Sequence, residues 1–309
     1  MNTKTLMYIL KRIALALLTV WVVITVTFFV MRAVPGGPFL GEKAITESAQ
    51  AALEAKYGLD KPLMEQYFTY LKDVVTRFDF GPSLKLRGRQ VLDIIVDGMK
   101  VSVKLGLTAA GIALVCGIVL GAAAALRRNK LIDKVIMVLT TACISMPSFI
   151  MGTLLLLVFA LQLAIFPANG ETAKGLILPI ITLSLSPMAN ITRLTRSSML
   201  DVLGQDYIRT ARAKGLPEKK VIYHHAFRNT LIPLVTFIGG SLPGLFAGAL
   251  ITETLFGIPG IGYASYHSMI SGDIPFSMFY LVFLAVLTLA GNLISDILYA
   301  VVDPRVRIA

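Results

Sequence analysis

Acidic residues inside apolar stretches are the side chains of this sequence that could do chemistry. Asp296 lies in the last apolar run, with Asp303 seven residues later on nearly the same helix face, and Glu253 lies at the end of another run. Ionisable groups are costly in hydrocarbon and often mark proton relays, so Asp296 and Glu253 would suit a proton-coupled secondary transporter. We favour a structural interpretation, in which Asp296 and Asp303 pair with basic residues such as Arg193 or Arg196 near the same membrane face.

The motifs of enzymes and metal sites are missing from the sequence. It has no GxxxxGK[ST] loop to cradle ATP phosphates, no HExxH zinc motif, no GxSxG serine nucleophile and no GxGD intramembrane protease motif. Cys116 and Cys143 lie in apolar runs without metal spacing, and the adjacent His224 and His225 would point to different sides of a helix. We therefore expect no catalytic residue, no metal and no cofactor, and the energy for any active process must come from a partner.

A basic segment from Asp206 to Pro233, DYIRTARAKGLPEKKVIYHHAFRNTLIP, interrupts the apolar sequence. Tyr207 to Lys214 holds good helix formers, and Gly215 stands where a left-handed residue would end that helix. Pro217 suits the first position of a second helix, with Glu218 in its first turn. The segment is therefore predicted to be a helix, a tight turn and a second helix.

The first helix of this segment should have two different faces. Tyr207, Ile208 and Ala211 share one face, which can pack against the protein. Arg209 and Arg212 share another, which can meet an acidic or polar partner. A solvated loop that only orients the chain in a membrane would explain the charge alone, whereas docking of a partner explains the whole segment.

The composition places the chain in a membrane. The 309 residues are 56% hydrophobic with a mean hydropathy of +0.75. An ordinary soluble domain carries about 45–50% apolar residues. The net charge of +11 lies in loops between apolar runs rather than in one stripe with aromatic residues, which argues against nucleic acid as a partner and for the lipid bilayer.

Six apolar runs are candidates to cross a bilayer, which takes about 20 residues per helix. They are Ile13 to Met31, Val101 to Leu126, Leu131 to Phe166, Leu176 to Ile191, Leu231 to Leu255 and Phe276 to Val302. With the N-terminus in the cytosol, the cytosolic segments hold 17 lysines and arginines, and the two short outer loops hold one. This distribution predicts six transmembrane helices with both termini in the cytosol.

The long segment from residue 32 to residue 100 is predicted to be a small helical region outside the cytosol. Thr46 can cap a helix through Tyr57, and Asp60 with Pro62 can start a second helix through Phe78. The second helix carries an apolar stripe at helical spacing, made of Leu63, Tyr67, Leu71, Val74 and Phe78. This stripe either packs on the outer ends of the spans or meets a solute-receptor protein, and the two interpretations are compatible.

Glycine and proline interrupt the apolar runs at defined places. After Glu253, the chain must turn or re-enter at the outer surface, because a continued helix is prevented by Gly257, Pro259, Gly260 and Gly262.

Within the spans, Pro147 and Pro187 should cause kinks, which suit a rocking bundle or a fixed bend. Small residues such as Gly111, Gly117 and Gly121 allow close helix approach, either inside the chain or to a second membrane subunit.

Several strings of the sequence resemble one family of membrane proteins. These are YIRTARAKGL and HAFRNTLIP in the basic segment, VPGGPFLGE after the first run, ETLFGIPGIG after the fifth and DILYAVVDPRVR at the end. They resemble the permease subunits of bacterial ATP-binding-cassette (ABC) importers, in the peptide and nickel branch. The match covers essentially the whole chain and is most specific for the B-type subunits of oligopeptide importers.

The basic segment resembles the conserved cytoplasmic loop of that family. Arg209, Thr210, Ala211 and Gly215 stand at its Glu, Ala, Ala and Gly positions, so Ala211 and Gly215 are the literal matches. The later Ile, Leu and Pro positions of the general pattern hold other residues here, namely His225, Phe227 and Arg228. The resemblance implies a coupling helix that docks in a groove of an ATPase subunit, formed by Tyr207, Arg209, Thr210, Ala211, Arg212, Ala213, Lys214, Gly215 and Leu216.

The resemblance also implies an architecture. We expect an all-α polytopic membrane protein with six transmembrane helices and the fold of a type I importer permease. Residues 1–31 would form the cytosolic N-terminus and first transmembrane helix, residues 32–100 an extracytoplasmic helical region, and residues 101–309 a five-helix core with a cytosolic coupling loop at 192–230. A short gate-like element is implied at the outer loop that follows Glu253.

The partners implied by the resemblance are a second homologous permease subunit, two ATPase subunits, an extracytoplasmic peptide-binding protein and a peptide substrate. The predicted function is import of oligopeptides across the bacterial cytoplasmic membrane. An importer of the same class for dipeptides, nickel or another small solute is an alternative, as is a proton-coupled secondary transporter.

Overall fold

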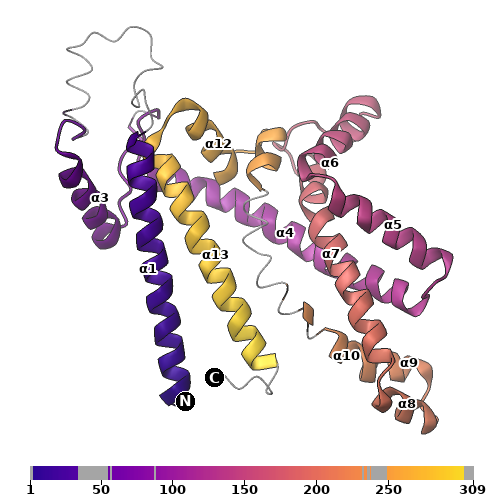
Figure 1. The fold of residues 1–309 in the computed structure, drawn as a ribbon. Helices are drawn as coiled ribbons and strands as arrows, with labels where there is room; N and C mark the ends of the chain where they lie inside the picture. Colours follow the sequence, from indigo (N-terminus) through magenta and orange to yellow (C-terminus); the bar gives the residue numbers. More distant parts are fainter. Residues whose placement is uncertain are drawn as a thin grey trace. The chain divides into compact units, whose positions relative to one another are not determined.

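The structure is a computed structural model that describes residues 3–33, 55, 58–86, 88–231, 233–234, 237 and 249–302 (Figure 1). Its α-helices are α1 (Thr3–Ala33), α3 (Leu63–Arg77), α4 (Val91–Leu126), α5 (Leu131–Ser145), α6 (Ser148–Leu155), α7 (Ile177–Leu203), α8 (Asp206–Ala213), α9 (Glu218–Lys220), α10 (Phe227–Thr230), α12 (Ile261–Ser271) and α13 (Ile274–Val302). Two π-helical segments, η1 (Leu156–Gln162) and η2 (Val221–Ala226), continue α6 and α9, and residues 249–255 are also helical. No strand occurs in the described part of the chain, and the predicted all-α class is confirmed.

Four helical stretches are long and apolar enough to cross a membrane, namely Lys11–Ala33, Val91–Leu126, Ile177–Leu203 and Ile274–Leu293. A fifth candidate is the pair Leu131–Ser145 and Ser148–Gln162, whose arms are bent by 109°. The remaining predicted span, Leu231 to Leu255, falls mostly outside the described residues. The chain is therefore a multi-pass membrane protein, while the number six and the extracytoplasmic position of residues 32–100 stay predictions.

The run from Leu131 to Phe166, predicted as one span, is broken in its middle. Met146 has an extended backbone with φ −94° and ψ 130°, and Pro147 then precedes α6. Proline has no N–H to donate, and its ring pushes the preceding residue out of the helical region. Pro187 behaves differently because it lies inside α7, which continues through it.

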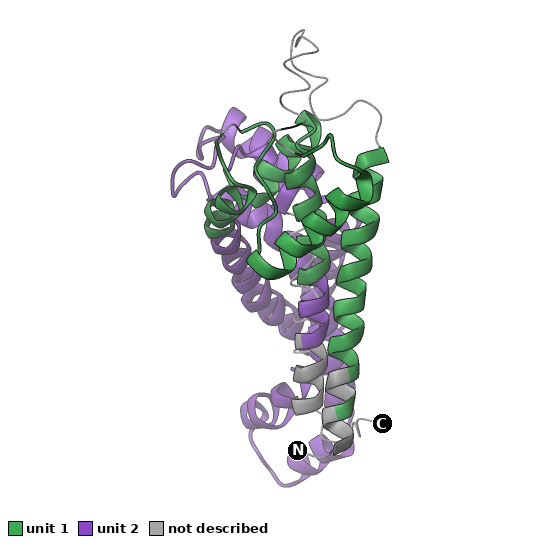
Figure 2. Ribbon diagram, turned by 90° about the vertical axis from the view of Figure 1, so that its left-hand side faces the viewer, with its two compact units in different colours: residues 1–101, 259–287 green, residues 102–258, 288–309 purple. Residues whose placement is uncertain are grey.

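The described chain divides into two compact units (Figure 2). Unit 1 comprises residues 1–101 and 259–287, and unit 2 comprises residues 102–258 and 288–309. The helices α4 and α13 each contribute residues to both units.

In unit 1, the helices α1, α3 and α13 share a buried core. One cluster joins Phe28, Tyr67 and Met278, and the Tyr67 hydroxyl lies 2.8 Å from Thr25 Oγ1. A second cluster joins residues from the same three helices, namely Ile24, Val74 and Val282. Burial of aromatic and aliphatic side chains is the main favourable term in such packing. The apolar stripe predicted on α3 thus packs on neighbouring helices.

The bounds of α3 agree with the sequence. Pro62 precedes the helix, and Phe78 ends it in the left-handed conformation with φ 52°. The two ends of the predicted stripe stay outside this core, because Leu63 is 44% and Phe78 71% exposed. The other helix predicted in this region, from Thr46 to Tyr57, falls outside the described residues apart from residue 55.

Unit 2 is built around α7. A side-chain carbon added at Gly121 of α4 would lie 2.5 Å from the Thr192 carbonyl oxygen, and one at Gly117 would lie 2.7 Å from Ile191 Cγ2. A side-chain carbon added at Gly152 of α6 would likewise lie 3.0 Å from Thr182 Cγ2 of α7. The small residues of α4 therefore serve close packing inside the chain at Gly117 and Gly121, whereas a carbon at Gly111 would meet nothing within 4 Å.

We predict opposite effects of alanine at two of these glycines. Gly121→Ala should lower the thermal unfolding midpoint of the detergent-purified protein, since overpacking costs about 1–3 kcal/mol. Gly111→Ala should be neutral or stabilising, because alanine is favoured over glycine in a helix by about 0.8–1.0 kcal/mol. Equal midpoints for the two variants would contradict the assignment of Gly121 to the α4 and α7 contact.

Candidate functional site

The basic segment begins with α8, and its first turn follows directly on the end of α7. Gly204 and Gln205 connect the two helices, and Gln205 has the extended backbone of an N-cap, with φ −74° and ψ 151°. Gly215 ends the turn after α8 with φ +75°, the left-handed conformation predicted from the sequence. A side-chain carbon there would meet no atom within 4 Å, so the demand for glycine comes from the backbone conformation rather than from space.

One face of α8 is buried. Ile208 and Ala211 are 0% and 5% exposed and pack with Val221 and Ala226 of η2. Partly buried side chains at the end of α7 and in the turn, Val202, Leu203 and Leu216, complete this cluster. The predicted packing role of Ile208 and Ala211 is confirmed, and the cluster fixes α8 to the end of α7.

Tyr207 corrects the sequence prediction for this face. Its side chain is 42% exposed, and its hydroxyl accepts a hydrogen bond of 2.8 Å from Asn229 Nδ2. Tyr207 is adjacent to Ile208 in sequence, so its side chain leaves the helix axis in a different direction. In that direction it meets the polar Asn229 of α10 instead of an apolar pocket. Tyr207 therefore ties α8 to α10 at the surface.

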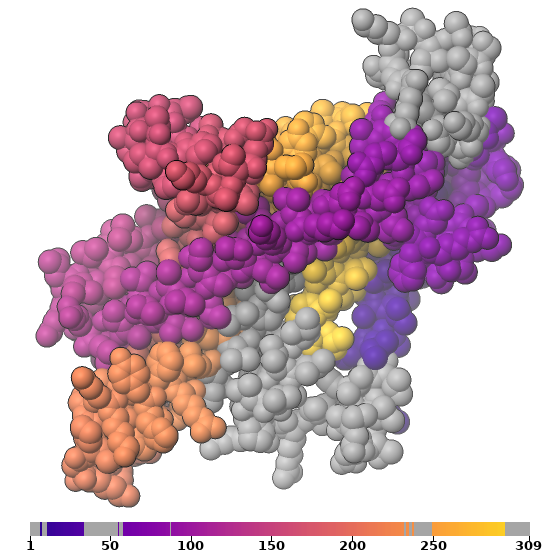
Figure 3. All heavy atoms as spheres, turned by 180° about the vertical axis from the view of Figure 1, so that it is seen from behind, coloured from indigo at the N-terminus to yellow at the C-terminus, as the bar shows by residue number. Residues whose placement is uncertain are grey.

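The other face of α8 is basic and open to solvent. The Arg209 side chain is 74% exposed, and its contact with Asp206 is long, at 3.4 Å. Arg212 is engaged within the segment, because its Nη2 and Nε donate to the Glu218 carboxylate at 2.7 and 3.2 Å. Figure 3 shows atoms of this segment, in orange, at the molecular surface. Arg209 is thus the cation of α8 that is most available to a partner.

The Arg212 and Glu218 pair bridges the turn at Gly215. The hydrogen bond from Arg212 lowers the pKa of Glu218, and the carboxylate raises the pKa of Arg212. A carboxyl whose folded pKa is lowered stabilises the fold above its ordinary pKa, and this contribution is lost as the pH falls through the lowered value. Both side chains are about half exposed, so solvent screens the pair and its contribution is small.

The second helix of the segment differs in detail from the prediction. Pro217 is the N-cap with φ −61° and ψ 140°, one position before the helix, and Glu218 is the first helical residue. After Lys220 the helix widens into η2, which contains His224 and His225 with ring planes 88° apart. Within the described residues no group of histidine, cysteine or acidic side chains is arranged to hold a metal.

An ion pair anchors α5 to α7 near this segment, and the sequence analysis missed it. Arg196 donates from Nε and Nη2 to the two carboxylate oxygens of Asp133, at 2.6 and 2.8 Å. The backbone N–H of Asn129 donates to the same carboxylate at 2.8 Å. Asp133 is 3% exposed. Arg196 thus has a partner in Asp133 of α5, whereas the pairing expected between Arg193 or Arg196 and Asp296 or Asp303 stays a prediction.

Asp296 itself lies in the helical backbone of α13, and its side chain and Asp303 are outside the described residues. Its assignment as a structural or a functional acid stays a prediction.

The loop after residue 255 turns as predicted. Gly257 is left-handed with φ +61°, and the Ile258 N–H donates to the Glu253 carbonyl oxygen at 2.8 Å. The Gly170 N–H donates to the Phe256 carbonyl oxygen at 2.9 Å, and a side-chain carbon at Gly170 would lie 2.2 Å from Ile258 Cγ1. In unit 2, the turn at residues 256–258 is thus held by the loop that precedes α7.

Glu253 is fully buried at the start of this turn. Its carboxylate accepts a hydrogen bond of 2.5 Å from Ser102 Oγ, and its exposed fraction is 0%. A buried carboxyl needs such partners, because a charge or polar group without them is costly. The position of Glu253 next to the turn is as predicted, and its burial suits a group that holds the turn in place.

Unit 1 contains the remainder of the predicted gate loop. Pro259 and Gly260 lead into α12, whose N-cap is Gly260 and which includes Gly262. A side-chain carbon at Gly98 of α4 would lie 2.8 Å from the Ile261 nitrogen, so the start of α12 packs tightly on α4. His267 lies in α12 with its ring centroid 4.2 Å from that of Tyr263.

Comparison with known proteins covers most of the chain. The family described as binding-protein-dependent transport system inner membrane component matches residues 117–308, and the N-terminal family of such membrane components matches residues 5–105. The dipeptide transport system permease protein DppB of Bacillus subtilis is 44% identical over 302 residues, which cover 97% of this chain and 98% of the relative. The oligopeptide transport system permease protein OppB of Haemophilus influenzae is 40% identical over 305 residues, covering 98% and 99%.

Solved structures share the fold at low sequence identity. An amino acid ABC transporter matches with a TM-score of 0.52 and 15% identity, over 67% of this chain and 93% of that one. The inward-facing MetNI methionine ABC transporter matches with a TM-score of 0.51 and 17% identity, over 67% and 97%. These values indicate that the helical core has the fold of ABC importer permeases.

The chain is thus a multi-pass membrane permease of the ABC importer class, and it belongs to the family of inner membrane components of binding-protein-dependent transport systems. Its full-length relatives are peptide permeases of the OppB and DppB type. A permease of this class is not itself an enzyme. It works in a complex with other ABC subunits, in which separate ATPases hydrolyse ATP and a binding protein supplies the solute.

We predict that the ion pair between α5 and α7 contributes to stability. Asp133→Asn should lower the free energy of unfolding by about 1–3 kcal/mol, because the partly buried Arg196 loses its charged and buried partner. The exposed Asp201 of α7 provides a control, and Asp201→Asn should stay within about 0.5 kcal/mol of the parent protein. The measurement is thermal or denaturant unfolding in detergent. Adding Arg196→Gln to Asp133→Asn should recover part of the loss, and a strictly additive double variant would contradict the pairing.

Proposed function

We propose that the chain is the permease subunit through which an ATP-driven, binding-protein-dependent importer moves oligopeptides into the cytosol. The family and its full-length peptide permease relatives support the class of transport. The proton-coupled alternative loses its support, because the chain belongs to a family whose energy comes from ATPase subunits. Our proposal includes a second homologous permease, two ATPase subunits and an extracytoplasmic peptide-binding protein as partners, with both termini of the chain in the cytosol.

Dipeptides are the second candidate substrate. The 44% identical relative is a dipeptide permease, while the 40% identical one is an oligopeptide permease. Oligopeptides are favoured by the string after the first span, which resembles the B-type subunit of oligopeptide importers, whereas the basic segment resembles the peptide branch as a whole. Mass spectrometry of ligands eluted from the cognate binding protein distinguishes the two, since peptides of two residues alone would overturn the preference for oligopeptides.

The basic segment carries the proposed mechanism. Its buried face is fixed to α7 by Ile208 and Ala211, and its exposed face offers Arg209 to a partner. A helix that is packed on one side and charged on the other transmits a push to the helix it is packed on. We propose that Tyr207 to Leu216 docks on an ATPase subunit, and that ATP binding there moves α7 and shifts the permease between its states.

The proposed outer gate comprises Glu253 and the turn through Gly257, Pro259, Gly260 and Gly262. The fixed turn at Gly257 and the burial of Glu253 support a rigid outer element rather than a loose loop.

We predict that Gly215→Val uncouples ATP hydrolysis from uptake. Valine at φ +75° is strained by about 1–3 kcal/mol, so the turn between α8 and α9 should change while the membrane helices stay folded. Gly204→Val is the matched control, because Gly204 has φ −80° and a side-chain carbon there is 3.5 Å from its nearest neighbour. Uptake of labelled peptide and ATPase activity are measured in proteoliposomes with the cognate subunits. Full transport by Gly215→Val would contradict the proposed docking of Tyr207 to Leu216 on an ATPase subunit.

Charge reversal tests the exposed face separately. Arg209→Glu should reduce uptake by at least about tenfold, as expected when a charge-assisted contact is replaced by repulsion. The control is Lys174→Glu, which makes the same charge change at an exposed residue of the loop before α7. Membrane abundance of both variants is checked by immunoblot. Equal uptake by Arg209→Glu and Lys174→Glu would show that the partner binds elsewhere.

A further inference from the structure

Helix α3 carries a second row of apolar side chains beside those that pack on α1 and α13. Met64, Phe68, Val75 and Phe78 recur at helical spacing and share one side of the helix. Their side chains are 56%, 60%, 66% and 71% exposed. A group of large apolar side chains exposed together marks a contact with a partner or with lipid. These four residues are called the exposed row.

The contacts of α3 with α1 locate the start of the row relative to the membrane. α1 contains one of the stretches that can cross a membrane, and Arg32 is the last cation of this helix. Arg32 Nη1 donates to Gln66 Oε1 near the start of α3, which fixes the guanidinium there. The next residue of α3, Tyr67, packs on Phe28, which is four residues further inside α1. The helix α3 therefore starts beside the end of the span and runs inward.

Further along α3 the contacts lie deeper. Val74 packs with Ile24 of α1 and with Val282 of α13. Ile24 is eight residues from Arg32, and Val282 is eight residues from Ile274 at the start of α13. At 1.5 Å per residue, both contacts lie about 12 Å along a spanning helix from its end.

The length of α1 leaves little of the helix outside the lipid. The stretch Lys11–Ala33 has 23 residues and is about 34 Å long, whereas the hydrocarbon layer is about 30 Å thick. A residue about 12 Å from the end of such a span lies inside the hydrocarbon layer. The part of α3 that packs beside Ile24 therefore lies at the depth of the acyl chains, as Figure 1 illustrates with α3 next to the C-terminal half of α1.

After α3 the chain returns to the same end of the spanning helices. The Phe80 ring packs edge-to-face on Phe279 of α13, with the centroids 4.7 Å apart. Ser83 Oγ then donates to the Asp273 carboxylate, directly before α13 begins. Phe80 is half-buried and Ser83 is buried, which suits non-helical backbone next to hydrocarbon because protein must cover it. The segment thus enters and leaves on one side.

The exposed row continues a side of α1 that is itself uncovered. Val26 and Val30 of α1 are 55% and 56% exposed on the spanning helix. Beside them, the Phe29 ring stacks on Tyr67 at 5.5 Å between centroids, and Tyr67 in turn contacts Phe68 of the row at 5.3 Å. A continuous apolar surface therefore runs from a lipid-facing side of a spanning helix onto α3.

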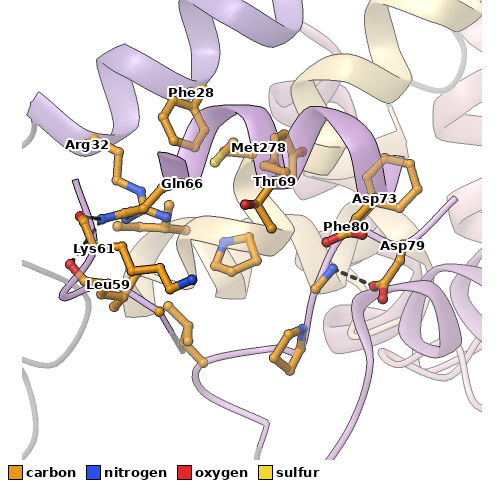
Figure 4. Close-up of a pocket in the computed structure, with 17 residues that line it drawn as sticks. Phe28, Arg32, Leu59, Lys61, Gln66, Thr69, Asp73, Asp79, Phe80 and Met278 are labelled. Carbon is orange, nitrogen blue, oxygen red and sulfur yellow. Dashed lines mark hydrogen bonds between the residues drawn. The ribbon is translucent and has the colours of Figure 1, made fainter. Parts of the chain in front are cut away.

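The polar groups of α3 have an environment that suits a helix in a leaflet. The end of the helix is closed by the Asp79 N–H, which donates to the Asp73 carbonyl oxygen at 3.2 Å. Thr69 and Asp73 line a cavity of about 340 Å³ in unit 1, which is polar and roomy enough to admit water (Figure 4). Lys72 lies beside the exposed row, and its long side chain leans toward the shallower, N-terminal end of α3, so its ammonium can reach the headgroups.

We propose that α3 is a re-entrant helix, and that its exposed row lies among the acyl chains of phospholipids in the leaflet at the C-terminal end of α1. In the predicted topology this is the outer leaflet. The proposal moves α3 from the predicted extracytoplasmic region into the membrane, and it holds for any transported solute. A water-soluble partner cannot reach this depth, which favours lipid over the solute-receptor protein considered for this helix.

Spin labels measure both the surroundings and the depth of the row. Cys116 and Cys143 are replaced by alanine, and one nitroxide is attached through Phe68→Cys or Val75→Cys. The chain is purified with its accompanying subunits, without binding protein, and placed in phosphatidylcholine liposomes. Dissolved oxygen concentrates in hydrocarbon and a neutral nickel chelate concentrates in water. The ratio of their collision rates with the nitroxide therefore reports its depth.

Both labels of the row should collide more with oxygen than with the nickel chelate. The label at Val75 should lie about 6 Å deeper than the label at Phe68, because the contacts of α3 move inward by four residues of α1 between them. Labels at Val30 and Val22 on the exposed side of α1, about 12 Å apart, calibrate the depth. Thr69→Cys is the matched control next to Phe68, and its label should favour the nickel chelate because Thr69 lines the polar cavity.

Three results would each overturn the proposal. An excess of nickel collisions at Phe68 and Val75 would place the row in water, and loss of these collisions on addition of the binding protein would assign it to that protein. Equal depths would describe a helix lying flat on the membrane. Few collisions with either reagent would mean that another subunit covers the row.

Two further labels guard against a variant that fails to assemble. Met64→Cys and Phe78→Cys extend the series to both ends of the row, and the label at Phe78 should lie deeper than the label at Met64. Uptake by each labelled transporter in the same liposomes confirms that the complex is intact. A reversed order of depth in transporters that retain uptake would also contradict the re-entrant path.

Discussion

Close packing on α7 is the constraint on which unit 2 depends. Glycines of α4 and α6 bring those helices against it, and Arg196 binds the buried Asp133 at the start of α5. At its far end, Val202 and Leu203 pack on α8. A helix held on several sides moves as a rod, because a well-packed interior resists local deformation. A force applied to α8 can therefore reach α4, α5 and α6 through α7.

The residue types of the basic segment have different roles in the structure. The small and aliphatic side chains attach it, the glycine sets its turn, and the Arg212 and Glu218 pair closes that turn from outside. Among the described residues, Arg209 makes only a long contact to Asp206. Because Arg209 takes no part in the buried cluster, a substitution of Arg209 should leave the fold of the segment intact. The charge of the exposed face can therefore differ to suit a partner, while the packing of the segment on α7 stays the same.

Local features were predictable from the sequence, and long-range pairings were not. The left-handed Gly215, the end of α3 at Phe78 and the turn after Glu253 depend on neighbouring residues, so helix and turn preferences sufficed. The burial of Ile208 and Ala211 followed from helical spacing. The partner of Arg196, the exposure of Tyr207 and the fixed Arg32 depend on residues far away in sequence. A kink at Pro147 was predicted from the proline, but the size of the bend, 109°, was not, because the apolar run continues across it and hydropathy carries no information about the direction of the chain.

The bend between α5 and α6 has a consequence for the surrounding lipid. Each arm has 15 residues, and the α-helical arm Leu131–Ser145 is about 22 Å long at 1.5 Å per residue, whereas the hydrocarbon layer is about 30 Å thick. Since the chain direction changes by 109° between the two arms, their lengths do not add up along the membrane normal. The acyl chains beside them must shorten or tilt to avoid exposing backbone ends, at a cost of a fraction of a kcal/mol per Å of mismatch. A neighbouring helical protein that covers this side would relieve that deformation, so the bilayer itself favours assembly there.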